Sequence, residues 1–171
     1  MNMNKQELLK KIQGLLLYLS GLLDKYKTMN LNLQKFHQGA IYFLGKDASP
    51  IDLAGDELGC AETLNEIYKK TFGEYMSPAN ILSTYRLYEA IKNSPKFVRT
   101  TSPEEGTIIL SPTGYSSKGA KNGHVGIIGK AGIIMSNDSR SGLFLENYTL
   151  QSWKQYYGDK LGFPMYFFNV T

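Results

Sequence analysis

The chain has only one cysteine among its 171 residues, so it forms no intramolecular disulfide and its fold does not depend on an oxidising compartment. This residue, Cys60, and the two histidines, His37 and His124, have no zinc-ligand spacing, so we expect no metal and no cofactor. There is no arginine-rich block and no nucleic-acid motif, and we therefore exclude nucleic acid as a partner. The net charge of +4 would suit anionic lipid or the polymers of a bacterial wall, but the basic residues are spread thinly, which favours a charge that only keeps the protein soluble.

A long apolar run is also missing. The most apolar segment, GLLLYLSGLL at residues 14–23, is shorter than the ~20 residues needed to span a membrane, and no small-residue cleavage site follows it. Its leucines recur at helical spacing, which predicts an amphipathic helix over about residues 4–27. We expect this helix to pack on the domain, on a partner helix such as another virion protein, or on a membrane surface. A signal anchor is the alternative.

The remaining sequence predicts helices first and strands after. A polar break at residues 28–32 separates the first helix from the rest, so we assign residues 1–30 to an N-terminal amphipathic helix and residues 31–171 to one domain. Further helices are expected at 36–44, at 61–72 before Gly73, and from Ser77-Pro78 to Ile91, with a loop at 45–59. Strands are expected at 107–110, 124–128, 132–135, 143–148 and 163–170. This order indicates an α+β fold with helices packed on an antiparallel sheet.

Cys60 lies where the loop ends and a helix begins. Unpaired N–H groups and the positive end of a helix dipole stabilise a thiolate at such a position, and the same donors can bind the oxyanion formed when the thiolate attacks a carbonyl. The alternative for a lone cysteine is a small apolar residue in the core.

A thiolate nucleophile needs a general base, and His124 is the candidate. It opens an apolar strand directly after a glycine-rich segment, whereas His37 lies within a helix and is expected to have a structural role. The base in turn needs a polar group that orients its ring. The next strand ends in Ser136-Asn137-Asp138, from which we select Asn137, with Asp138 as the alternative and Ser136 as a weaker candidate.

Four segments, DELGCAETLNEIYKKTFG, PEEGTIILSP, NGHVGIIG and IIMSNDS, resemble the papain-like cell-wall hydrolases of the NlpC and CHAP types. The resemblance covers about residues 45–170 and looks closest to the small versions of bacteria and bacteriophages. It implies a papain-like fold, with Cys60 as the nucleophile, His124 as the base and Asn137 as the orienting residue. The surroundings of Cys60 and the Thr107 position depart from the usual family pattern, which leaves the subfamily and the cleaved bond open.

The resemblance implies hydrolysis of an amide bond in bacterial peptidoglycan, either by an endopeptidase or by an N-acetylmuramoyl-L-alanine amidase. The protein would be made in the cytoplasm without a clear cleavable signal and would act in the cell wall or within a phage virion. Two other functions stay open. One is a non-catalytic virion or wall-binding protein, which the amphipathic helix and the glycine-rich residues 114–123 favour. The other is a cysteine protease or transglutaminase-like enzyme that acts on proteins.

Overall fold

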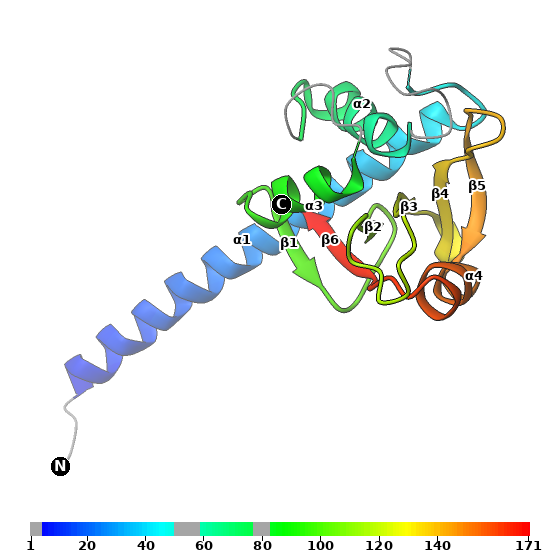
Figure 1. The fold of residues 1–171 in the computed structure, drawn as a ribbon. Coiled ribbons are helices and arrows are strands. Elements are labelled where there is room, and N and C mark those ends of the chain that lie inside the picture. Colours follow the sequence, from blue (N-terminus) through cyan, green and yellow to red (C-terminus); the bar gives the residue numbers. More distant parts are fainter. Residues whose placement is uncertain (1–4, 50–58, 77–82) are drawn as a thin grey trace.

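The computed structural model describes residues 5–49, 59–76 and 83–171, in which helices precede strands along the chain (Figure 1). The helices are α1 (Lys5–Phe43), α2 (Cys60–Phe72), α3 (Thr84–Lys92) and α4 (Leu150–Trp153), and α4 continues into the π-helical segment η3 (Lys154–Lys160). The strands are β1 (Phe97–Thr100), β2 (Ile108–Ser111), β3 (His124–Ile128), β4 (Ile133–Asn137), β5 (Phe144–Thr149) and β6 (Tyr166–Val170). A single 3-10 turn, η2 (Lys130–Gly132), joins β3 to β4.

α1 is one continuous helix of 39 residues, so the predicted break at residues 28–32 is wrong. The segment contains no glycine or proline, and its Thr28 hydroxyl donates a hydrogen bond to the Asp24 carbonyl within the helix, at 2.9 Å. Residues 5–28 are all exposed and project from the domain, and burial of the helix begins at Met29 (Figure 1). The predicted boundary between the N-terminal helix and the domain, after residue 30, therefore lies inside α1 and close to Met29. None of the helices within the described ranges is both long and apolar enough to cross a bilayer.

The six strands form one antiparallel sheet in the order β1-β6-β2-β3-β4-β5. Strands β2 to β5 are neighbours in chain order, whereas β6 returns from the end of the chain and inserts between β1 and β2. The expected α+β class is confirmed by this antiparallel sheet and the helices packed on it. β1 is an edge strand that the sequence did not predict.

Helices cover both faces of the sheet. One face forms the larger core with α1, α2 and α3, and to it β3 contributes Val125 and Ile127. The opposite face forms a smaller core around Trp153 of α4, to which β3 contributes Ile128. Neighbouring side chains of a strand point to opposite faces, which explains how one apolar strand supplies both cores.

α2 agrees with the predicted helix, and Gly73 ends it with a left-handed conformation (φ 80°) and an N–H bonded to the Lys69 carbonyl. α3 begins at Thr84, where the Ser83 side chain accepts a hydrogen bond from the backbone N–H of Tyr85. The predicted start of this helix at Ser77-Pro78 lies outside the described residues.

Candidate active site

The start of α2 places Cys60 against the sheet. Gly59 precedes it, and the carbonyl of Gly59 accepts the first helical hydrogen bond, from the N–H of Thr63 at 2.8 Å. A Cβ atom at position 59 would lie 2.7 Å from the Ser49 hydroxyl and 3.3 Å from the Asn137 amide nitrogen. A side chain at position 59 would therefore crowd Ser49 and Asn137, and glycine lets α2 begin close to both.

Three backbone N–H groups near the Cys60 sulfur favour its thiolate form. They belong to Cys60 itself and Ala61 at the start of α2, and to Val125 of β3. Burial nevertheless dominates and raises the thiol pKa to about 11, while the three donors lower it in part. The resting thiol is therefore protonated at neutral pH, and its sulfur lies beside the residue that follows His124.

The imidazole of His124 is held by a hydrogen-bonded chain. Its Nε2 lies 3.0 Å from the Ser136 hydroxyl, which itself donates to the Asn147 side-chain oxygen at 2.7 Å. The Asn147 amide group also donates to the Ser136 carbonyl at 3.4 Å, which fixes the orientation of the Asn147 side chain. Because Ser136 uses its proton on Asn147, it accepts the Nε2–H of His124. The other ring nitrogen, Nδ1, then carries a lone pair and can accept a proton.

Aromatic rings enclose the same imidazole. Trp153 and Tyr157 stack on it, with centroids 5.3 and 5.4 Å away and interplanar angles of 24° and 17°, and Tyr148 approaches edge-on at 6.0 Å. The Trp153 ring is held in turn by a 3.1 Å hydrogen bond from its N–H to the Ser111 hydroxyl. Burial lowers the pKa of His124 to about 4, against a smaller opposing effect of the nearby negative charge of Asp138. The ring is neutral at physiological pH.

The thiol and the imidazole both lie near the start of β3, and they pack in different cores. Cys60 packs against the larger core, and the His124 ring lies among the side chains of the smaller one. Within the described residues no hydrogen bond joins them, and Nε2 of His124 is bonded to Ser136. Tyr157 bridges the region: its pKa is raised by burial first, then by its contact with Tyr148 and, more weakly, by the proximity of Cys60.

The expectation that Asn137 orients His124 is contradicted by the geometry. Ser136 makes the contact, because Ser136 and Asn137 are neighbours on a strand and point to opposite faces. Asn137 lies beside Gly59 on the α2 side. Asp138, the alternative candidate, accepts hydrogen bonds from the backbone N–H and hydroxyl of Ser141 and is a turn residue.

Comparison with known proteins finds no matching family model, curated protein or solved structure.

Several residues around His124 were not predicted. Ser136 was named only as the weaker candidate, and its pairing with Gly126 places it on the same face of the sheet as His124. Asn147, Trp153 and Tyr157 have no sequence signal, because only the folded sheet and the turn into α4 bring them to His124. The other histidine, His37, is buried on α1, with its Nδ1 3.5 Å from the Glu105 carboxylate, which agrees with the structural role expected for it.

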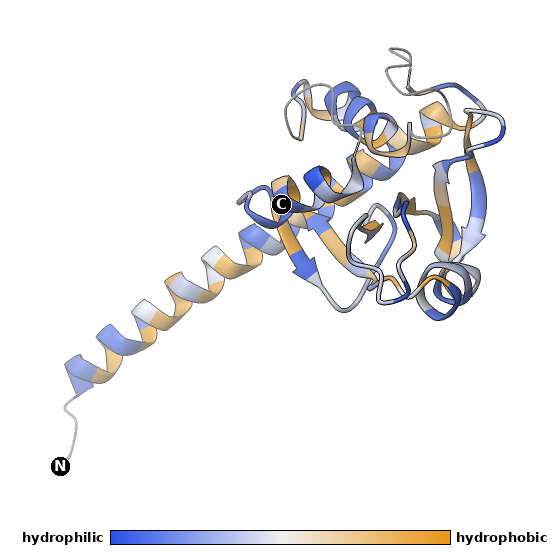
Figure 2. Ribbon diagram, viewed as in Figure 1, coloured by the Kyte–Doolittle hydropathy of each residue, from blue (hydrophilic) through white to orange (hydrophobic). Residues whose placement is uncertain are grey.

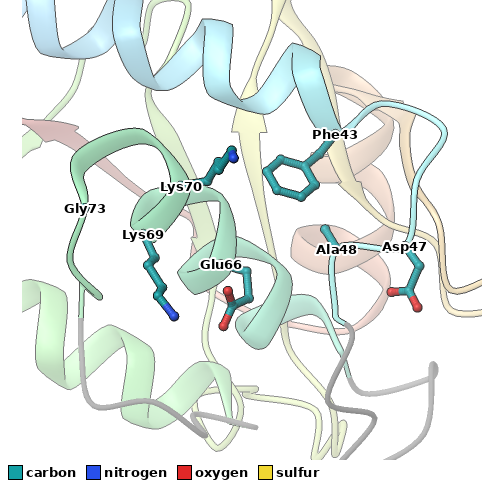
Figure 3. Close-up of a pocket in the computed structure, with 7 residues that line it drawn as sticks. All are labelled: Phe43, Asp47, Ala48, Glu66, Lys69, Lys70 and Gly73. Atoms are coloured by element: carbon teal, nitrogen blue, oxygen red, sulfur yellow. The ribbon is translucent and has the colours of Figure 1, made fainter.

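A cavity of about 430 Å³ lies beside the second half of α2 (Figure 3). Its lining carries both signs of charge and one aromatic ring: Phe43, Asp47, Ala48, Glu66, Lys69, Lys70 and Gly73. At the helical rise of ~1.5 Å per residue, Glu66 lies about 9 Å along α2 from Cys60. The cavity is therefore next to the candidate active site and separate from it.

Proposed function

We propose that the protein is a cysteine hydrolase that cleaves an amide bond of bacterial peptidoglycan, with Cys60 as the nucleophile and His124 as the general base. The observation that carries the proposal is the Asn147–Ser136–His124 chain. It leaves Nδ1 as the basic nitrogen of the imidazole, and a general base requires this defined tautomer.

The reaction starts from a neutral pair, because the pKa of Cys60 is about 11 and that of His124 about 4. For this step the imidazole has to come within hydrogen-bond distance of the thiol, and Nδ1 of His124 then takes the thiol proton as the sulfur attacks the carbonyl carbon of the amide. The backbone N–H groups at the start of α2 stabilise the negative charge that develops. The imidazolium then gives its proton to the leaving amine, and water hydrolyses the thioester to release the acid and restore the thiol.

Peptidoglycan as the substrate rests on the resemblance of the sequence to papain-like cell-wall hydrolases, and two physical features support it. The net charge of +4 favours the anionic polymers of a bacterial wall. The cavity along α2 offers carboxylates from Asp47 and Glu66 and ammonium groups from Lys69 and Lys70, which suits a stem peptide that carries both signs of charge. The protein would then act at the cell wall, brought there by a virion or by lysis.

The test is digestion of purified peptidoglycan, with the new termini identified by mass spectrometry. New amino termini within the stem peptide indicate an endopeptidase, and release of muramic acid from L-alanine indicates an amidase. Cys60→Ala and His124→Ala should each abolish the products, and the double variant should be little worse than either, because the two residues act as one unit. His37→Ala is the matched control and should retain activity. Digestion by Cys60→Ala would refute the assignment of the nucleophile.

A second candidate is a non-catalytic wall-binding or virion protein. The observation that favours it is the pair of opposed pKa values: the thiol resists deprotonation and the stacked imidazole resists protonation. In the same experiment, co-sedimentation of the chain with peptidoglycan without new termini would support this function and overturn the first.

A further inference from the structure

The exposed part of α1 carries a continuous apolar stripe. Figures 1 and 2 show the helix projecting from the domain with hydrophobic residues along it. The stripe consists of large side chains, each at least 44% exposed: Leu8, Leu9, Ile12, Leu15, Leu16, Leu19, Leu22, Leu23 and Tyr26. At 1.5 Å per residue, residues 5–28 extend for ~36 Å. A monomer in water would leave this whole surface solvated.

The spacing of the stripe is that of a helix–helix seam. Six of its residues follow one another at alternating steps of four and three, which is the a/d pattern of a coiled coil: Leu8, Ile12, Leu15, Leu19, Leu22 and Tyr26. The same steps lead on through Met29 to Leu33, Phe36 and Ala40, which are buried against the domain. One face of α1 is therefore covered by the chain's own domain in its last third and by nothing described in its first two thirds.

We propose that a second copy of the chain covers this face, with the two α1 helices packed antiparallel. A parallel, in-register partner is excluded because the two domains would overlap. Each helix would need its seam facing the other along its full length, but from Leu33 onward that side of the helix is occupied by the domain. In an antiparallel pair, the partner helix runs away from its own domain and ends at the other.

The seam has the symmetry that this arrangement requires. A two-fold axis near Leu17 places Leu8 against Tyr26, Ile12 against Leu22, and Leu15 against Leu19 of the second copy. The same axis brings Lys5, the first residue of α1, opposite Met29, where burial by the domain begins. The partner helix therefore fills the exposed length of the stripe and stops at the domain.

The antiparallel direction also accounts for the width of the stripe. Leu9, Leu16 and Leu23 flank the seam on one side, at the e positions. In an antiparallel pair, e positions face e positions, so Leu16 meets its own copy and Leu9 meets Leu23. These three leucines are then buried together with the seam.

The charge pattern favours a protein partner over a lipid surface. Helices that lie on membranes carry lysine or arginine along their polar face. Here residues 12–23 contain no charged side chain, and outside the stripe that stretch consists of Gln13, Gly14, Leu17, Tyr18, Ser20 and Gly21. In the exposed part of α1, lysines occur only before residue 12 and after residue 23.

The oligomeric state of the full chain tests the proposal. Analytical ultracentrifugation between 1 and 50 μM should give a discrete dimer. Leu15→Glu should raise the dissociation constant at least ~100-fold, because the dimer would then place two carboxylates at its centre. Leu17→Glu is the matched control: Leu17 is the most exposed leucine of α1 at 76%, lies off the seam, and should leave the dimer intact. A monomeric wild-type chain, a polydisperse aggregate, or equal dissociation by both variants would overturn the proposal.

Disulfide trapping tests the direction of the helices. In a Cys60→Ala background, chains with Leu8→Cys should cross-link to chains with Tyr26→Cys when the two are mixed, and neither should cross-link alone. Cross-linking of Leu8→Cys chains to each other would instead indicate parallel helices. Flotation with vesicles of phosphatidylcholine and phosphatidylglycerol provides the other decisive result: a monomeric chain that floats with the vesicles would assign the stripe to a lipid surface.

Discussion

Acid should destabilise this protein mainly through one buried histidine. Burial lowers the pKa of His124 from 6.5 to about 4, so the unfolded chain binds a proton that the folded protein resists. The stability that comes from keeping the ring neutral is complete above pH 6.5 and is lost as the pH falls towards 4. At 1.36 kcal/mol per pKa unit, the loss reaches about 3 kcal/mol at pH 4, and about 2 kcal/mol of it has occurred by pH 5.

Urea unfolding followed by circular dichroism at 222 nm, at intervals from pH 7 to pH 4, measures this loss. With an m value of ~2 kcal/mol per molar urea, 3 kcal/mol corresponds to a fall of about 1.5 M in the midpoint. Carboxylates also titrate in this range, so the comparison is with His124→Gln, which keeps them and removes the imidazole. The wild-type protein should lose about 3 kcal/mol more than this variant. Parallel pH curves for wild type and His124→Gln would refute the reasoning.

Three other changes have defined outcomes. Ser136→Ala should reduce peptidoglycan hydrolysis by ~10- to 100-fold by removing the acceptor that fixes the imidazole tautomer, whereas Asn137→Ala should reduce it less, and initial rates compare the two. Alkylation of Cys60 by iodoacetamide should accelerate ~10-fold per pH unit from pH 7 to 10, because its pKa is about 11; a rate that is flat over this range would contradict the burial of the thiol. Gly106→Ala should cost ~3 kcal/mol or more in thermal unfolding, because φ is 90° and the new Cβ would lie 2.2 Å from a carbonyl oxygen of α1. Gly119→Ala, at φ 73° in open space, should cost only ~1 kcal/mol.

Local patterns predicted most of the secondary structure. β3 begins and ends where its apolar run does, and Gly73 ends α2 as expected. The break expected at residues 28–32 failed because threonine and asparagine only weakly disfavour helix, and packing of the next turns on the domain outweighs that preference. β1 could not be predicted from its four residues, because its stability comes from pairing with β6, about 70 positions later along the chain.

The sequence predicted where the candidate residues lie along the chain, but it did not predict which side chains contact one another. Cys60 and His124 stand out because a helix start and a strand start are visible in the sequence. The orienting group was misassigned because the choice between Ser136 and Asn137 depends on which face of the sheet β4 turns toward His124, and the start of a strand varies by a residue or two. The aromatic rings around His124 are positioned by α4. This helix begins directly after β5, where Thr149 and Ser152 form its capping box, and no loop residues in the sequence mark the change from strand to helix.

The enclosure of His124 gives the protein a built-in optical reporter. Trp153 is the only tryptophan of the chain, is fully buried, and has its indole N–H bonded to Ser111. Its ring stacks on the imidazole at 5.3 Å, so a proton on His124 would place a positive charge against the indole. Protonation of His124, by acid or in the proposed reaction, should therefore change the fluorescence of the protein, and a stopped-flow trace could follow it without any label.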